Sequence, residues 1–127
     1  MSKLGCITGQ NEAELLQVIK ENPNNKNAIY FGAALLLEAG RRHDALTWYQ
    51  TLLELDAHYP GLCRKLGSMY EDTQEYGQAI HYYAMALDAE PELQDSIHLK
   101  LGHLYVMMND NDMACAHYRK VFYPEQT

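Results

Sequence analysis

Apolar and polar residues alternate along the chain with the period of an amphipathic helix, most clearly between Pro60 and Leu93. Two helical segments in this stretch are separated by the polar turn EDTQE. The residues at helical spacing are Cys63, Leu66, Gly67 and Tyr70 on the first segment, and Ala79, Tyr83 and Ala86 on the second. Because Gly67 has no side chain, the two backbones can approach closely, and the ring of Tyr83 fills the space beside it. The pattern therefore predicts a helical hairpin, which Pro91 ends because proline has no amide hydrogen.

The same pattern recurs at spacings of 34 and 35 residues, which predicts neighbouring hairpins. Ala45, Tyr49 and Leu53 precede Ala79, Tyr83 and Leu87 by 34 residues, and Gly102, Tyr105, Ala114 and Tyr118 follow Gly67, Tyr70, Ala79 and Tyr83 by 35. The extra residue lies between Pro91 and Lys100, where Ile97 and His98 compete for the place of Cys63. Leu15, Val18 and Ile19 match the second helix of the first hairpin, which predicts part of one further repeat.

The stretch from Pro60 to Leu93 resembles the tetratricopeptide repeat in its small residue and aromatic residue on the first helix, its Ala-x3-aromatic pair on the second and its closing proline. This resemblance implies an all-α fold, a right-handed helical-repeat array of three such hairpins preceded by a single N-terminal helix. The expected organisation is a flexible leader at 1–10 and a single domain at 11–127, made of a half repeat at 11–23 and repeats at about 26–59, 60–93 and 94–127. Gly40 is expected to end the first helix of the first full repeat in a left-handed conformation.

Charge narrows the range of partners. Ten basic and seventeen acidic residues give the chain a net charge of −7. Nucleic acids and anionic membranes attract basic surfaces, so neither is an expected partner. No apolar run is long enough for a membrane span. Three cysteines cannot all pair with one another, and an odd number suits a reducing compartment, so the expected location is cytoplasmic.

Catalytic and metal-binding patterns are weak. The six histidines are scattered, and none forms the helical pair of a zinc site. His103 and His117 can approach each other across the third hairpin near Cys115, but ordinary surface or boundary histidines are the favoured interpretation. Cys63 lies on the packing face of its helix, as expected of a core residue. We therefore expect no enzymatic activity, no bound metal and no cofactor.

The resemblance implies a binding surface, because the first helices of successive repeats in this family line a concave groove. The residues expected to bind a peptide there are Tyr30, Leu37, Arg64, Ser68, Leu99, His103, Val106 and Met107. Apolar side chains gather at both ends of this set, which favours an apolar peptide segment as the ligand. Lysines and asparagines that grip acidic tails in some family members have few counterparts here. Two alternatives stay open: Leu99 can pack against a neighbouring helix, and Arg64 can pair with an acid such as Glu71 or Glu38 instead of the peptide.

The leading hypothesis is an adaptor or chaperone that binds another protein. One alternative is a structural subunit that assembles through its open repeat ends. Another is a protein similar to bacterial type III secretion chaperones, which it resembles in size and groove character.

An uncovered apolar surface is predicted on the last helix, because residues at one equivalent position of successive repeats are apolar. Ile19, Leu53 and Leu87 are continued by Phe122, and a parallel column ends at Cys115. With Val121 and Met113, these residues are expected to form an apolar patch. The patch predicts self-association, most simply a homodimer in which Phe122 contacts the second copy.

Overall fold

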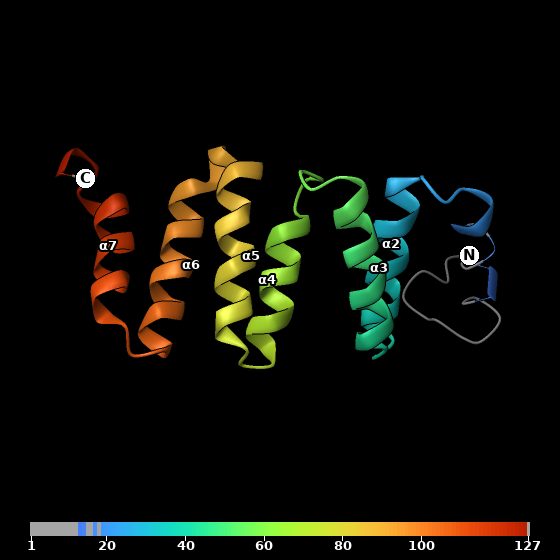
Figure 1. The fold of residues 1–127 in the computed structure, drawn as a ribbon, viewed down its shortest axis with the longest axis horizontal. Helices are drawn as coiled ribbons and strands as arrows, with labels where there is room; N and C mark the ends of the chain where they lie inside the picture. Colours follow the sequence, from blue (N-terminus) through green and yellow to red (C-terminus); the bar gives the residue numbers. More distant parts are fainter. Residues whose placement is uncertain (1–12, 15–16, 18, 127) are drawn as a thin grey trace. The chain divides into compact units, whose positions relative to one another are not determined.

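The computed structural model describes residues 13–14, 17 and 19–126, and this part of the chain is helical with connecting turns (Figure 1). Its helices are α2 (Lys26–Glu38), α3 (Arg42–Leu55), α4 (Leu62–Asp72), α5 (Tyr76–Ala89), α6 (Gln94–Met107) and α7 (Asn111–Phe122), with short 3₁₀ helices η1 (Pro91–Leu93) and η2 (Pro124–Gln126). Two compact units divide the chain, Met1–Ala57 and His58–Thr127. The predicted leader at 1–10 lies outside the described residues, as does part of the predicted half repeat at 11–23.

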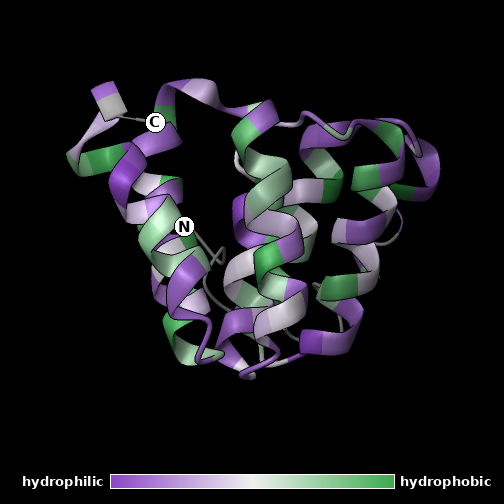
Figure 2. Ribbon diagram, turned by 60° about the vertical axis from the view of Figure 1, so that its left-hand side comes forward, coloured by the Kyte–Doolittle hydropathy of each residue, from purple (hydrophilic) through white to green (hydrophobic). Residues whose placement is uncertain are grey.

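Each pair of consecutive helices in the predicted hairpins packs together. In the first unit α2 packs on α3, and in the second α4 packs on α5, α5 on α6 and α6 on α7. Figure 2 shows apolar and polar residues alternating on these helices, as expected of amphipathic segments. The all-α helical-repeat class predicted from the sequence is confirmed. The division of the chain into one domain with the stated repeat boundaries stays a prediction.

A glycine at the contact between the two helices of a hairpin allows them to lie close together. A Cβ atom added to Gly67 would lie 2.8 Å from Cδ2 and Cε2 of Tyr83, and one added to Gly102 would lie 2.6 Å from Cε1 of Tyr118. The contact predicted between Gly67 and Tyr83 is therefore present, and the third repeat reproduces it. Only a residue without Cβ permits this approach without displacing the ring.

The three hairpin turns share one backbone conformation. Gly40, Gln74 and Asn109 occupy equivalent repeat positions and have φ values of 83°, 63° and 64°. In each turn the next residue donates its amide hydrogen to the carbonyl five residues earlier, as from Arg41 to Leu36 at 2.9 Å, which is the closing bond of a Schellman motif. The left-handed stop predicted at Gly40 is confirmed.

The junction between the second and third repeats contains the extra residue. Helix η1 occupies Pro91–Leu93 between α5 and α6. Ile97 and His98 are both buried in α6. A shift of 35 residues aligns them with Leu62 and Cys63, which are both buried in α4. The two candidates for the place of Cys63 are thus both core residues, and His98 occupies that place.

Candidate protein-binding surface

Helix α6 exposes three large apolar side chains on one face. Leu99, Val106 and Met107 are 40%, 42% and 46% exposed, whereas Ile97, Leu101 and Leu104 on the opposite face are buried. His103 lies between them and is also exposed. Residues 99, 103, 106 and 107 share a helical face by their spacing. We call Leu99, His103, Val106 and Met107 the α6 row. Met108, which the sequence argument did not include, is exposed beside its end.

Arg64 of α4 is held by a carboxylate. Its guanidinium donates Nε–H to Oε1 of Glu90 at 2.7 Å and Nη2–H to Oε2 at 3.3 Å. The Glu90 side chain is nearly buried, so this bidentate pair joins the first turn of α4 to the end of α5. Arg64 therefore pairs with an acid, but that acid is Glu90 and not Glu71 or Glu38. Its contact with a peptide stays a prediction. Periodicity on the first helices could not identify Glu90, because it follows the second helix.

Glu71, near the end of α4, joins three structural elements. The Tyr83 hydroxyl of α5 donates to Glu71 Oε1 at 3.3 Å, and Lys100 Nζ of α6 donates to Glu71 Oε2 at 3.4 Å. Burial, with Glu71 as the next cause, raises the pKa of Tyr83 to about 12. Ser68, one turn before Glu71, is half-buried on the same helix. Of the two predicted α4 site residues, Arg64 has a protein partner in Glu90, and Ser68 is partly covered.

The first unit contains the other two predicted groove residues, Tyr30 and Leu37, which are both half-buried on α2. The Tyr30 ring packs edge-on against Tyr49 of α3, with ring centroids 5.6 Å apart, and against Phe31 of its own helix at 5.8 Å. Tyr30 therefore contributes to packing within its own hairpin. Phe31, which the sequence argument passed over, is 62% exposed.

A histidine pair connects α6 and α7. His98 Nδ1 lies 3.0 Å from His117 Nδ1, so one ring must donate and the other accept. Tyr105 stacks on His117 with ring centroids 5.5 Å apart. Burial is the main cause that lowers the pKa of both histidines; Lys120 lowers both further, and Asp95 acts in the opposite direction on His98. His117 is thus paired with His98, whereas His103, which the sequence pattern suggested as its neighbour, is exposed.

Acidification should destabilise this helix pair. A histidine whose pKa is lower in the folded state binds more protons when unfolded, so its contribution is complete above about pH 6.5 and is lost as the pH falls through the folded pKa. Urea unfolding followed by circular dichroism should give a lower midpoint at about pH 5.5 than at about pH 7.5. The variant His117→Gln should reduce this difference, whereas His103→Gln, at an exposed position, should preserve it. An unchanged pH dependence in His117→Gln would contradict the assignment.

Helix α7 has an exposed outer face. Ala114 is its buried residue, whereas Phe122 and Met113 are 62% and 40% exposed. Cys115 is exposed and Val121 is half-buried. The residues predicted to form an apolar patch are therefore accessible in the described structure, except that Val121 is partly covered.

Geometry offers little for catalysis. The described residues contain no group of three or more His, Cys, Asp or Glu side chains able to hold a metal ion. Burial, with Glu90 as a second cause, raises the pKa of the Cys63 thiol, which disfavours the reactive thiolate.

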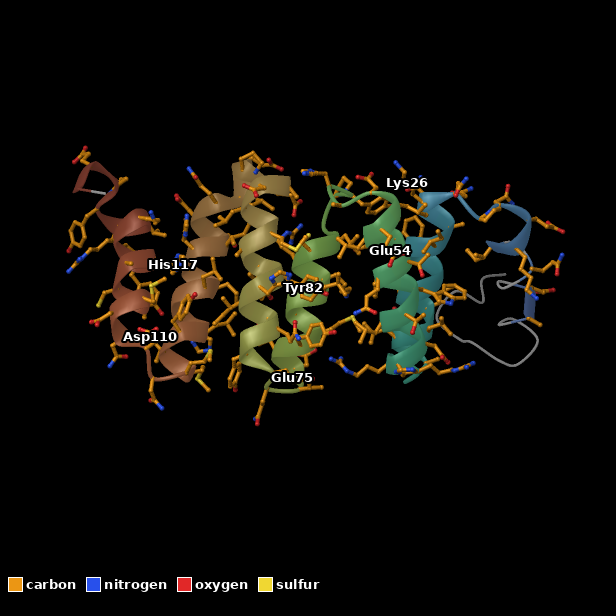
Figure 3. The ribbon with its side chains drawn as sticks, in the orientation of Figure 1. Lys26, Glu54, Glu75, Tyr82, Asp110 and His117 are labelled. Atoms are coloured by element: carbon orange, nitrogen blue, oxygen red, sulfur yellow. The ribbon has the colours of Figure 1, made fainter. Side chains whose placement is uncertain are left out.

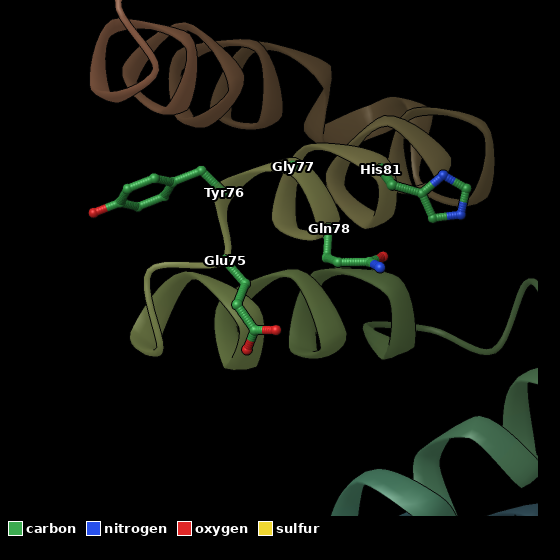
Figure 4. Close-up of a pocket in the computed structure, with 5 residues that line it drawn as sticks. All are labelled: Glu75, Tyr76, Gly77, Gln78 and His81. Carbon is green, nitrogen blue, oxygen red and sulfur yellow. The ribbon is translucent and has the colours of Figure 1, made fainter.

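A hollow of about 550 Å³ beside the start of α5 is lined by Glu75, Tyr76, Gly77, Gln78 and His81. Figure 4 shows the side chains of Tyr76 and His81 pointing away from each other, so they do not converge on a common ligand position. Across the described residues, no helix is both long and apolar enough to cross a bilayer.

Comparison with known proteins identifies the repeat. Two family models described as tetratricopeptide repeat match residues 62–96 and 95–123. The general transcriptional corepressor ssn6 of Schizosaccharomyces pombe is 29% identical over 79 residues, which cover 62% of this chain and 7% of the corepressor.

Solved structures show the same fold. A crystal structure of MamA protein aligns with a TM-score of 0.78 at 19% identity, covering 92% of this chain and 63% of that one. MamA from Desulfovibrio magneticus RS-1, residue 41 to the end, aligns with a TM-score of 0.71 at 25% identity, covering 92% and 66%. The chain therefore spans less than two thirds of these MamA chains and a small part of the corepressor.

Proposed function

Because the chain belongs to the tetratricopeptide-repeat family, whose members are generally non-enzymatic protein-interaction modules, we propose that it is an adaptor or chaperone that binds an apolar peptide segment of another protein. The proposed contact surface is the α6 row together with Arg64 and Ser68 of α4. Tyr30 and Leu37 of the first unit are proposed to provide a further contact. The protein is proposed to act in the cytoplasm and to catalyse no reaction.

The observation that carries this proposal is the exposure of the α6 row. Leu99, Val106 and Met107 leave apolar surface in contact with water on a helix whose other face is fully used for packing. Covering such surface is favourable by about 25 cal/mol per Å². Apolar clusters of this kind tend to mark interaction sites, and rows with helical spacing suit an extended or helical peptide.

The ion pair on α4 supports a positioning role for Arg64. Since Glu90 holds the guanidinium in a bidentate geometry, the side chain is already ordered before a ligand binds. The pair also lowers the net positive charge at this position, which fits an uncharged segment better than an acidic tail.

Glutamates in the α6 row should remove binding. In Val106→Glu combined with Met107→Glu, two charges replace apolar contacts, and we expect capture of partner proteins from native lysate to fall about tenfold or more. Capture is measured by affinity purification and quantitative mass spectrometry. The single change Leu37→Glu tests whether the first unit contributes to the capture of partner proteins. If this variant lowers capture as well, the contact includes α2.

The matched control is Ala84→Glu, which adds a glutamate at an exposed position of α5 outside the α6 row. It should capture the same proteins as the parent. Circular dichroism should show all variants folded. Identical captured proteins for parent and α6 double variant would contradict the proposed surface. The same experiment addresses the secretion-chaperone alternative, because captured proteins would then be secretion substrates held through apolar segments.

A second candidate function is that of a structural subunit that assembles through α7. The supporting observation is the accessible apolar surface of Phe122, Met113 and Cys115. Burying an exposed phenylalanine is worth about 1.5–3 kcal/mol, so a second copy is a favourable cover. A two-fold arrangement would place Phe122 against the equivalent region of the second copy.

Self-association should depend on Phe122. Light scattering at tens of micromolar protein should give a mass above that of the monomer, and Phe122→Glu should return it to the monomer value because a buried carboxylate is costly. Ala84→Glu serves again as the control for added charge. A monomer at all concentrations, unaffected by Phe122→Glu, would exclude assembly through this face.

A further inference from the structure

Acidic side chains gather at one end of the second unit, beside the end of the α6 row. They are Glu71, Asp72 and Glu75 around the α4–α5 turn, and Asp110 and Asp112 around the α6–α7 turn. We call these five residues the acidic end. Figure 3 shows Glu75 and Asp110 at the same end of this unit, and Figure 1 shows that both turns lie there.

The lysine and arginine residues of this unit lie away from the acidic end or form an ion pair with one of its carboxylates. Arg64 and Lys65 belong to the first turn of α4 and Arg119 and Lys120 to the last turn of α7, at the opposite end. Lys100, in the middle of α6, donates to Glu71 at 3.4 Å. It therefore offsets one of the five carboxylates, and the acidic end keeps a negative potential.

Backbone dipoles largely offset one another here, because α4 and α6 end at this end of the unit and α5 and α7 begin there. The potential therefore comes from the carboxylates, and the last turns of α4 and α6 contain no basic residue to oppose them. Asp72 is the last residue of α4 and its side chain is exposed, so it is available to a partner.

The acidic end adjoins the apolar row through α6. Lys100 faces α4, because it reaches Glu71. Met107, seven residues later, lies on the same helical face as Lys100 by its spacing. It also lies in the last turn of α6. When an apolar side chain of a ligand contacts Val106 and Met107, the residues next to it in the ligand sequence would therefore lie beside the carboxylates of the acidic end.

We propose that the ligand of this surface is a peptide segment of a partner protein whose apolar residues are flanked by lysine or arginine. The inference rests on the proposed function, because it assigns the chemistry of the segment that the α6 row binds. Charge complementarity selects this occupant: an acidic tail would meet like charges at the end of the row, whereas a basic flank meets opposite ones. Repulsion of acidic segments also gives the surface specificity.

A randomised peptide display library tests the proposal without a known partner. The full chain is immobilised, and the peptides that it retains are sequenced. We expect enrichment of apolar residues with lysine or arginine next to them and depletion of aspartate and glutamate. The enriched peptides are then synthesised and their Kd is measured by fluorescence anisotropy. The Kd should rise with added salt, because salt screens exposed charge pairs.

Two charge-matched double variants localise the effect. Asp72→Asn with Glu75→Gln removes two carboxylates of the acidic end, and we expect a loss of affinity of about fivefold to tenfold at low salt. Asp88→Asn with Glu92→Gln removes two exposed carboxylates elsewhere in the same unit and should leave the Kd unchanged. Val106→Ser with Met107→Ser should abolish binding without altering charge.

The outcomes separate the inference from the function on which it rests. Enriched apolar peptides with no preference for basic flanks, lost in the serine variant, would overturn the inference and leave the proposed function standing. Equal losses in the two carboxylate variants would overturn it too, because attraction would then follow net charge alone. Enrichment of acidic peptides would overturn it directly. If the library yields no enriched peptide, or if the serine variant retains the enriched peptides, both the inference and the proposed surface fail.

Discussion

Replacing Tyr83 with alanine is expected to lower the free energy of unfolding by about 3–5 kcal/mol. The side chain is 6% exposed, and its ring lies against the Cα of Gly67. Gly67 has no side chain that could move into the vacated volume, so a cavity remains between α4 and α5. Alanine also removes the hydroxyl that donates to Glu71 at 3.3 Å. Loss of that donor adds to the cost of the lost burial.

Urea unfolding followed by circular dichroism measures this change. The control Tyr83→Phe keeps the ring and removes only the hydroxyl, so it should cost about 0.5–1.5 kcal/mol. The difference between the two variants reports the burial of the ring. A cost below about 1 kcal/mol for Tyr83→Ala, within the range of ordinary substitutions, would mean that the Gly67–Tyr83 contact does not hold the hairpin together.

The complementary substitution, Gly67→Ala, should destabilise the protein by about 1–3 kcal/mol although it inserts a single methyl group. The new Cβ would lie 2.8 Å from two ring carbons of Tyr83 and 3.1 Å from Cγ. Cγ is close to the backbone, and the ring is buried, so Tyr83 cannot swing aside. The helices must separate instead. Gly67→Leu, with more atoms to place, should cost still more.

Gly77→Ala is the matched control, because it is the same substitution in a neighbouring helix. A Cβ atom at Gly77 meets nothing within 4 Å. It should therefore stabilise the protein by about 0.5–1 kcal/mol, as alanine does in unhindered helix positions. In the double variant Gly67→Ala with Tyr83→Ala, the added methyl group enters the space that the ring leaves. The combined cost should be smaller than the sum of the single costs, and additive costs would disprove direct contact.

Local steric requirements were predictable from the sequence. A glycine on the first helix of a repeat that faces an aromatic residue on the second helix predicts a close approach of the two helices. Gly67 and Tyr83 make this contact in the structure. Gly40 likewise ends its helix with a positive φ. Asn109 adopts the same conformation, which asparagine enters more readily than most residues, and Gln74 adopts it although glutamine gives no such signal. The hairpin as a whole requires the turn, and at Gln74 this tertiary requirement overrides the residue's own preference.

Side-chain partners were less predictable. The acid that pairs with Arg64 depends on where the chain leaves α5. Glu90 follows the last residue of that helix, and its backbone there is no longer helical. The pairing of His98 with His117 depends on the single extra residue near η1, which the sequence alone places only within a range. The exposure of Val106 and Met107 agrees with the expected surface, and their role in binding stays a prediction.

Tyr30 illustrates a further limit. Its spacing places it on the face of α2 that turns away from α3, but its ring is large enough to reach Tyr49. Helical periodicity gives the direction of the bond from Cα to Cβ and not the final position of a long side chain. Leu37, on the same helix, has a shorter side chain and is half-buried.

The order of the helix contacts also bears on how quickly the protein folds. The pairs that pack together are α2 with α3, α4 with α5, α5 with α6 and α6 with α7, and each pair is consecutive in the chain. Contacts between neighbouring segments require only short loops to close, and proteins dominated by them fold in about microseconds to milliseconds. Any of the three hairpins can start the process, and in the second unit a completed hairpin offers its neighbour a surface to fold against. A chain emerging from the ribosome can therefore bury its first apolar faces before its last helix has been synthesised.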